Sequence, residues 1–262
     1  MAFAWAPDGT RIRYWTSGAG TPILLIAGQA LPHSSWGTEV DRLASRHTVV
    51  TYDHRGVGES DGPVDEPYTT RGMAADAVAI LDDLGIDRAH VYGFSMGGRI
   101  AQWLAADHPD RVGALVLGST TPGDAHGVRR SRRATQILIG TDRRALLELF
   151  YTPEWIDAND MQSTAPLAKP HNRQTLALHY KASEGHDGWD ALSHIAAPTL
   201  VVHGSDDELA PVRNASIAAE RIPDSRLVIL DGARHGYFAE FPDVSDTVLD
   251  FIAGHGRGAV TA

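Results

Sequence analysis

Ser95 is the residue of this chain whose surroundings best suit nucleophilic chemistry. It lies in Gly93-Phe94-Ser95-Met96-Gly97-Gly98, between the apolar run 89–92 and the amphipathic run 99–106. A serine at so sharp a strand-to-helix turn adopts a strained backbone with positive φ, and glycines two residues away on either side let strand and helix approach closely. The hydroxyl then stands clear of the sheet, at the positive end of the helix. The sequence therefore predicts an exposed serine nucleophile.

Two further residues have the chemistry that such a nucleophile needs. Ester hydrolysis by serine requires a base to take the hydroxyl proton and an acid to orient that base. His235 follows the apolar run 226–230, and Asp207 follows the apolar run 199–202. Because the carboxyl ends of parallel strands form one edge of a sheet, we expect Ser95, Asp207 and His235 to converge there.

The elements that must position these residues alternate between strand and helix patterns. Two short alternating runs, 3–6 and 11–16, predict an antiparallel hairpin. Six apolar runs without alternation are typical of strands buried on both faces of a parallel sheet: 22–27, 48–52, 89–92, 114–117, 199–202 and 226–230. Helical patterns separate most of them, at 70–84, 98–107, 211–221 and 242–253. The order predicts an α/β fold, with helices on both faces of an open sheet.

One interval interrupts this alternation. Between residues 122 and 197, helical stretches such as 137–150 and 166–184 never yield a convincing strand. We expect a helical cap here, inserted between a first core part (1–121) and a second (198–262), or else a helical layer that merely packs on the core. A cap would cover a pocket near the carboxyl ends of the strands. Its candidate lining residues, several of which could equally be core residues, are Trp36, Phe94, Phe150, Tyr151, Trp155, Trp189 and Phe238.

Four segments resemble those of the α/β-hydrolase superfamily, and the resemblance covers nearly all of the chain outside the insertion. They are similar to the nucleophile elbow (93–98), the D-x-R-G-x-G-x-S loop (53–60), the acid segment (198–211) and the histidine loop (232–235, with Glu240 and Pro242). The resemblance implies an α/β-hydrolase fold with a mostly parallel eight-stranded sheet and a helical cap. It also implies the order nucleophile, acid, histidine, which is the order found here.

The same resemblance chooses between neighbouring acids. In its register the acid is Asp207, which lies three residues after Gly204 and four before Pro211. Asp206 is the competitor, expected instead to cap the loop, and Glu208 is a more distant alternative.

The positions of residues relative to Ser95 and to the first buried strand indicate which backbone NH groups would bind the oxyanion. Met96, directly after Ser95, supplies one of them at the start of the helix. Many relatives carry His-Gly after the first buried strand, but this chain reads Ala27-Gly28-Gln29-Ala30. The residue after Gly28 is expected to donate the second NH, which makes Gln29 the first choice and Ala30 the alternative.

The resulting hypothesis is a serine hydrolase, similar to esterases and lactonases, that cleaves a carboxylic ester or lactone of a small, largely apolar molecule through an acyl-enzyme and without a cofactor. A serine at the elbow excludes the aspartate-nucleophile branch of the fold. The elbow is also similar to those of cofactor-free bacterial haloperoxidases, C–C bond hydrolases and enol-lactonases. A hypothesis from another class is a small-molecule sensor that keeps the fold but has vestigial turnover.

The amino-acid composition limits the classes of partner and of site that this chain can have. The formal net charge of -10 argues against nucleic acid or an anionic membrane, because both need a basic face. The absence of cysteine excludes a thiol nucleophile, and His171, His179 and His186 lack the spacing of a metal site.

We expect a cytoplasmic protein, because the first residues do not read as a signal peptide. The oligomeric state, monomer or homodimer, is left open. The arginines of 129–133 either steer an anionic substrate or form a solvated helix face.

Overall fold

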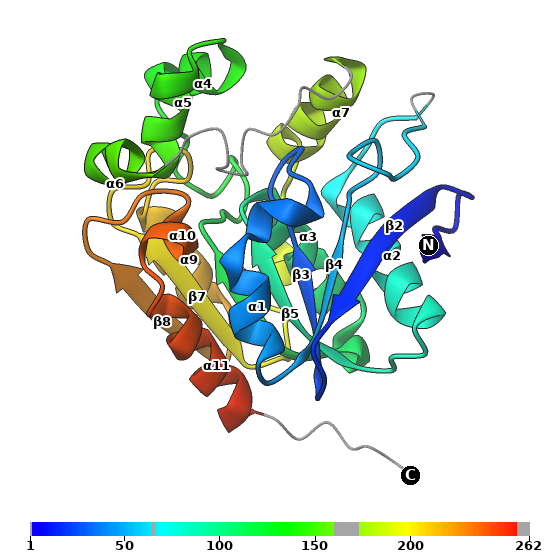
Figure 1. Ribbon diagram of the computed structural model, residues 1–262. Helices are drawn as coiled ribbons and strands as arrows, with labels where there is room; N and C mark the ends of the chain where they lie inside the picture. The colour runs from blue at the N-terminus through cyan, green and yellow to red at the C-terminus, as the bar shows by residue number, and fades with distance from the viewer. Residues whose placement is uncertain (1, 64–65, 160–172, 256–262) are drawn as a thin grey trace.

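The computed structural model describes residues 2–63, 66–159 and 173–255. Its centre is an eight-stranded sheet in the order β1-β2-β4-β3-β5-β6-β7-β8 (Figure 1). The first two pairings, β1 with β2 and β2 with β4, are antiparallel, and all the others are parallel. The strands are β1 (Phe3–Trp5), β2 (Arg11–Ser17), β3 (Pro22–Ile26), β4 (Thr48–Tyr52), β5 (Ala89–Phe94), β6 (Val112–Gly118), β7 (Thr199–Gly204) and β8 (Ser225–Leu230). The predicted fold class is confirmed.

Helices cover both faces of the sheet, as predicted. One face packs against α2 (Thr70–Asp83), α3 (Met96–Asp107) and α9 (Arg213–Arg221), and the other against α1 (Thr38–Ala44) and α11 (Val244–Gly254) (Figure 1). Every residue of β5 and β7 is buried, which explains why these runs show no alternation. Helix α1 has no clear amphipathic pattern in the sequence, because this short helix buries one charged and one apolar residue, Glu39 and Leu43. In the described part of the chain, no helix has the length and apolar character needed to cross a membrane.

In its described residues, the segment between β6 and β7 consists of helices and the loops that join them. It contains α4 (Arg132–Ile139), α5 (Arg143–Phe150), α6 (Pro153–Ala158), α7 (Arg173–Glu184) and α8 (Trp189–Leu192). Figure 1 shows α4 to α7 beyond the end of the sheet where the parallel strands finish. The run 137–150, predicted as one helical stretch, is two helices, because Gly140 ends α4 and the Asp142 side chain caps α5. The first part of the predicted run 166–184 lies outside the described residues.

The histidine loop follows β8 at the carboxyl edge of the sheet, and it leads into a short helix, α10 (Tyr237–Glu240). This loop is tied to the helical segment by two backbone bonds. The amide of His235 donates to the carbonyl of Leu149 over 3.3 Å, and that of Gly236 donates to Phe150 over 2.8 Å. The helical segment and the carboxyl edge of the sheet therefore form the walls of one site.

Candidate active site

Ser95 occupies the turn between β5 and α3 with φ 56° and ψ −118°, the positive φ that the sequence predicts. A Cβ atom on Gly93 would lie 2.4 Å from the Gly97 oxygen, and one on Gly97 would lie 1.9 Å from the Ile26 oxygen. Both positions therefore exclude any other residue. The Thr120 hydroxyl donates to the Ser95 carbonyl over 2.8 Å and holds the strained turn in place.

His235 lies between Ser95 and Asp207. Its Nε2 is 2.9 Å from the Ser95 hydroxyl, and its Nδ1 is 2.8 Å from Oδ2 of Asp207. An ionised carboxylate can only accept, so Nδ1 carries the proton of the neutral ring and Nε2 is left to accept the hydroxyl proton. The Ser119 hydroxyl donates to the His235 carbonyl over 2.9 Å, which fixes the loop behind the ring. These contacts give the histidine the tautomer that a general base needs.

Asp207 is buried, and both of its oxygens are engaged. Oδ1 accepts from the backbone amides of Leu209 and Ala210, each over 2.8 Å, and Oδ2 faces His235 and also Nε2 of His203 at 3.2 Å. Burial by itself raises the pKa of this carboxyl, but the attraction of His235 and the hydrogen bonds from His203 and His235 outweigh it and hold the pKa below its ordinary value. Asp207 is therefore ionised throughout the neutral range.

The two competing acids point elsewhere. Asp206 is exposed and accepts from the hydroxyl of Ser205 over 2.8 Å, and Glu208 is exposed and pairs with Arg133 at 2.7 Å. Among the described residues, Asp207 is the only carboxylate that bonds to the imidazole of His235.

The expected oxyanion donors lie next to the nucleophile. Met96 is the first residue of α3, and Gln29 lines the same cavity as Ser95. Within the described ranges, neither of these two amides has a hydrogen-bond acceptor. Ala30, the alternative donor, has φ 55°, and its amide lies 3.2 Å from Nδ1 of His179. The amide of Ala30 is thus engaged, and those of Gln29 and Met96 stay available to an oxyanion.

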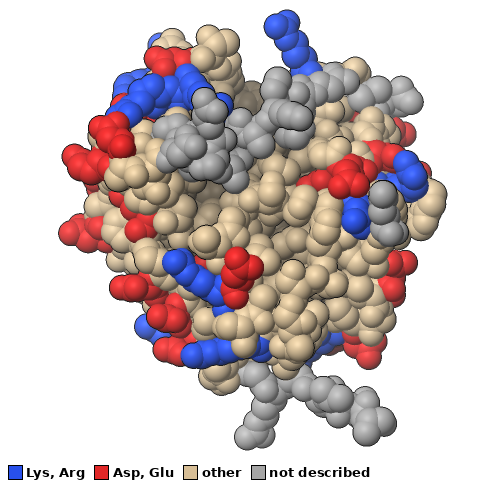
Figure 2. Space-filling view, viewed as in Figure 1, with Lys and Arg blue, Asp and Glu red and all other residues tan. Residues whose placement is uncertain are grey.

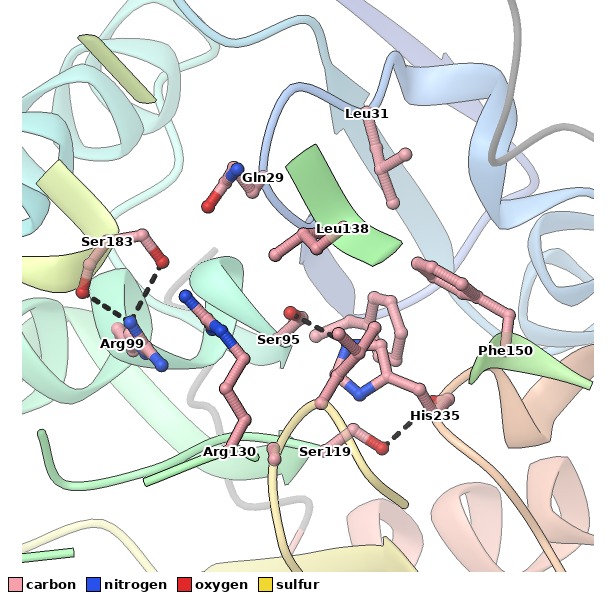
Figure 3. A pocket seen from close by; sticks show the side chains of 13 residues that line it. Gln29, Leu31, Ser95, Arg99, Ser119, Arg130, Leu138, Phe150, Ser183 and His235 are labelled. Carbon is pink, nitrogen blue, oxygen red and sulfur yellow. Dashed lines mark hydrogen bonds between the residues drawn. The ribbon is translucent and has the colours of Figure 1, made fainter. Parts of the chain in front are cut away.

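A small cavity opens beside the Ser95 hydroxyl (Figure 3). The space that the centre of a water molecule can reach there is about 60 Å³. Its apolar lining residues are Leu31, Phe94, Leu138, Phe150, Leu209 and Ala210. Its polar lining residues, apart from Ser95 and His235, are Gln29, Arg99, Ser119, Arg130 and Ser183. Two arginines lie in the wall of this cavity, although the sequence predicts a largely apolar substrate.

Phe94 is one of two residues that line this cavity among the seven aromatic residues named above as pocket candidates. For Trp36 and Phe238 the prediction is wrong, because they lie behind Phe94 in the core. The rings of Trp36 and Phe238 are 5.3 Å apart, and the ring of Phe238 is perpendicular to that of Phe94 at 5.0 Å. Phe150, by contrast, does line the cavity.

The three aromatic residues of the helical segment also pack away from the cavity. Tyr151 is buried against Trp155, with ring centroids 4.4 Å apart. Trp189 stacks on His126 at 4.6 Å and lies under the guanidinium of Arg221 at 4.7 Å. These contacts hold helices together, so the prediction that Tyr151, Trp155 and Trp189 line the pocket is wrong for this cavity.

Arg99 was not singled out from the sequence. It lies in the first turn of α3, is only 7% exposed, and donates through Nη1 to both the carbonyl and the hydroxyl of Ser183. Burial lowers the pKa of Arg99 to about 10, and the nearby cation of Arg130 adds to this effect. Arg99 is therefore still charged at pH 7. A cation among the apolar residues that follow the elbow was the sequence feature that could have revealed it.

His186 and His179, two of the three histidines considered above for a metal site, bond to neutral groups of the protein. His186 bonds to the hydroxyl of Thr70 and to the side-chain amide of Gln102, and His179 contacts the carbonyl of Arg55. His171 lies outside the described residues. Within the described ranges, there is no group of three or more His, Cys, Asp or Glu side chains suited to a metal ion.

Known proteins resemble this chain in sequence and in fold. A family model described as alpha/beta hydrolase fold matches residues 21–135. A relative named putative carbamate hydrolase RutD, from Azorhizobium caulinodans, is 33% identical over 95% of this chain and 97% of its own length. The solved enol-lactonase from Burkholderia xenovorans LB400 is 26% identical with a TM-score of 0.82, and covers 96% of this chain and 100% of its own. A solved esterase from Exiguobacterium antarcticum is 25% identical with a TM-score of 0.83, and covers 96% and 99%.

Proposed function

Because the chain belongs to the alpha/beta hydrolase family, we propose that it is a serine hydrolase that cleaves a carboxylic ester or lactone through an acyl-enzyme. The observation that supports this most is the continuous chain of hydrogen bonds from the Ser95 hydroxyl to His235, at 2.9 Å, and on to Asp207, at 2.8 Å. The resemblance to a solved esterase and a solved enol-lactonase points to the same reaction class.

Acylation begins when the Ser95 oxygen bonds to the carbonyl carbon and its proton passes to Nε2 of His235. Asp207 orients the ring and stabilises the imidazolium that forms. The amides of Met96 and Gln29 donate to the oxyanion of the tetrahedral intermediate. When the intermediate collapses, the bond between carbon and the leaving oxygen breaks. His235 then gives its proton to that oxygen, which leaves as the alcohol.

Deacylation repeats these steps with water. His235 takes a proton from the water as its oxygen bonds to the acyl carbon, and the second tetrahedral intermediate is held by the same two amides. Collapse breaks the bond to Ser95, which recovers its proton from His235, and the acid is released. No step needs a cofactor.

A second candidate substrate class is a carbamate, favoured by relatives that are named putative carbamate hydrolases. A carbamate presents the same carbonyl to Ser95 and the same oxyanion to Met96 and Gln29. It is a poorer electrophile than an ester, because the nitrogen lone pair is shared with the carbonyl. A substrate panel that separates the candidate activities contains methyl esters, simple lactones and methyl carbamates. Vinylogous diketones test for C–C bond hydrolysis, and an assay of peracid-dependent halogenation tests for haloperoxidase activity.

Replacement of the nucleophile tests the proposal. Ser95→Ala is expected to lower kcat on the best member of the panel by roughly 10⁴-fold or more, because every step passes through the serine oxygen. Ser17→Ala, the same change at an exposed serine of β2, is expected to leave kcat unchanged. A Ser95→Ala protein that still turned over the panel near the wild-type rate would exclude this serine as nucleophile. Labelling of Ser95 by a fluorophosphonate, with no turnover of any panel member, would instead favour a sensor.

A further inference from the structure

Arg99 is a buried cation without a carboxylate partner among the described residues. It follows Ser95 by one helical turn, since its amide donates to the Ser95 carbonyl over 3.3 Å. Its Nη1 is bonded to two neutral oxygens of Ser183, and its Nε and Nη2 make no hydrogen bond within the described ranges. A buried charge is unfavourable unless opposite charge or hydrogen bonds compensate it. This side chain is therefore suited to receive an anion.

Arg130 brings a second guanidinium to the same cavity. Its side chain is 12% exposed, whereas those of Arg129 and Arg133 in the same cluster are 75% and 62% exposed. Arg129 pairs with Asp124 on the surface, and Figure 2 shows basic side chains next to acidic ones over α4 and α5. Arg130 instead turns inward, and Figure 3 shows it on the same side of Ser95 as Arg99.

The cavity wall keeps an excess of positive charge. Arg130 forms an ion pair with Glu184, whose side chain is 34% exposed, and the Nε of Arg130 has no partner in the described part of the chain. Of the two guanidiniums, only that of Arg130 pairs directly with Glu184, at the end of α7, whereas Glu184 and Asp124 attract Arg99 without a hydrogen bond to it. Guanidinium groups bind carboxylates through paired, charge-assisted hydrogen bonds, and the donors that remain on Arg99 are the adjacent pair that such binding uses.

We propose that Arg99 and Arg130 form a subsite for a carboxylate of the substrate, so that the enzyme hydrolyses esters or lactones that carry a second, ionised acid group. The proposal rests on the proposed function, because it assumes that the bond cleaved is the one next to Ser95. It replaces the expectation of a largely apolar substrate. The apolar residues of the cavity, such as Phe150 and Leu209, then contact the carbon chain between the two acid groups.

Two substrates that differ at one group test the subsite. Monomethyl succinate carries a carboxylate, and methyl succinamate carries a neutral amide of nearly the same shape. We expect the wild-type enzyme to favour monomethyl succinate in kcat/KM by about 10- to 100-fold, the range of a charge-assisted hydrogen bond or two. Arg99→Gln and Arg130→Gln are each expected to bring this ratio close to 1, chiefly by raising KM for monomethyl succinate. Arg99→Lys keeps the charge and is expected to retain part of the preference.

Arg129→Gln is the matched control. It removes the same charge from the adjacent position of the chain, but from an exposed side chain, so the preference is expected to stay at the wild-type value. The alternative role of Arg99 is a structural link between α3 and Ser183 of α7. A purely structural link predicts that Arg99→Gln lowers kcat/KM equally for both substrates, and that Arg130→Gln keeps the ratio. Either that result or a wild-type ratio near 1 would overturn the subsite.

Binding separates failure of the subsite from failure of the proposed function. Calorimetry measures succinate and succinamide against Ser95→Ala and against Ser95→Ala combined with Arg99→Gln or Arg130→Gln. Succinate is expected to bind Ser95→Ala at least tenfold more tightly than succinamide, and each arginine change is expected to remove the difference. This outcome would support the subsite even if no ester were hydrolysed. Equal binding of succinate and succinamide by Ser95→Ala would overturn the subsite, even if Ser95 were established as the nucleophile.

Discussion

Arg55, which is partly buried, and Arg99, which is buried, lie in two regions with opposite electrostatic surroundings. Arg55, in the loop after β4, contacts Asp76 of α2 at 2.5 and 2.8 Å and Asp8 at 2.8 Å. Burial lowers the pKa of both arginines, but the bonds to Asp76 and Asp8 more than reverse this for Arg55 and hold its pKa above the ordinary value. Arg99 bonds to the neutral oxygens of Ser183 and keeps a lowered pKa. A buried charge that is paired with an opposite charge of the protein stabilises the fold. A buried charge that has no such partner is available to bind a ligand.

Two buried acids extend the same comparison. Asp207 accepts three hydrogen bonds, two of them from backbone amides, and its pKa is lowered. Glu39 of α1 accepts from the hydroxyl of Ser245 of α11, while its other oxygen has no partner in the described part of the chain. Burial raises the pKa of Glu39 to about 7, against the hydrogen bond from Ser245 and the charge of Arg42. Partners therefore decide whether a buried acid keeps its charge.

The largest effect is expected from removing the charge of Asp207. Asp207→Asn is expected to lower kcat by about 10³- to 10⁴-fold, because an amide neither stabilises the imidazolium of His235 nor fixes its tautomer. Steady-state rates on the best substrate measure the loss. Asp206→Asn is the matched control at the exposed neighbour and is expected to stay within a fewfold of wild type. If the two changes had equal effects, the assignment of the acid would fail.

A loss of stability rather than activity is expected where a charge is paired within the fold. Asp76→Asn leaves Arg55 partly buried without its closer carboxylate, and is expected to lower the free energy of unfolding by about 3 kcal/mol. Urea titration measures this change. Asp61→Asn breaks the exposed pair with Arg11 and is expected to leave the urea midpoint in place. The preference for monomethyl succinate is expected to persist in Asp76→Asn, and its loss there would contradict the distinction between Arg55 and Arg99.

The smallest effect is expected from Glu39, and it depends on pH. Its pKa is about 7 in the fold and near the ordinary 4.5 in the unfolded chain, so between these values the folded state binds the extra proton. Stability then falls as pH rises, by about 2 kcal/mol between pH 5 and pH 7. Glu39→Gln is expected to remove this slope and to be more stable than wild type at pH 8. Thermal unfolding of the wild-type and Glu39→Gln proteins at pH 5, 7 and 8 measures how the stability of each depends on pH.

Glu220→Gln, the same change at an exposed position of α9, provides the reference for the Glu39 experiment. Its stability is expected to follow the wild-type pH dependence. A Glu39→Gln protein that kept the wild-type slope would show that the burial of this carboxyl does not control its ionisation.

The fold and the nucleophile turn could be predicted because local sequence encodes them. Apolar runs specify strands that are buried on both faces. Gly93 is required by a close approach to Gly97 in the same turn, and Gly97 by a close approach to Ile26 of the neighbouring strand β3. Asp207 and His235 each follow a strand directly, so the parallel order of the sheet brings them together. Each of these inferences depends on the position of a residue along a strand or turn, and not on the rotamer of a side chain.

The cavity could not be predicted in the same way. Whether Trp36 or Phe150 faces Ser95 depends on how the segment before α1 and helix α5 pack against the sheet, and an aromatic residue in either place fits a core or a pocket equally well. Arg99 and Arg130 are similar cases, because sequence gives the charge of each but not its partners. Gly140 and Asp142 separate α4 from α5, and this break sets where Leu138 and Phe150 reach the cavity. Side-chain direction in this helical segment is a property of tertiary packing.

The single helical turn between Ser95 and Arg99 fixes a length. Because Ser95 directly precedes α3 and the guanidinium of Arg99 is held by Ser183, we expect the separation between the attacked carbonyl and a bound carboxylate to vary little, and one turn of helix rises about 5.4 Å. Along the series of monomethyl malonate, succinate, glutarate and adipate, kcat/KM is then expected to pass through a maximum at one chain length. Helix α3 would then select the substrate by the length of its carbon chain, in addition to supporting the turn that holds Ser95.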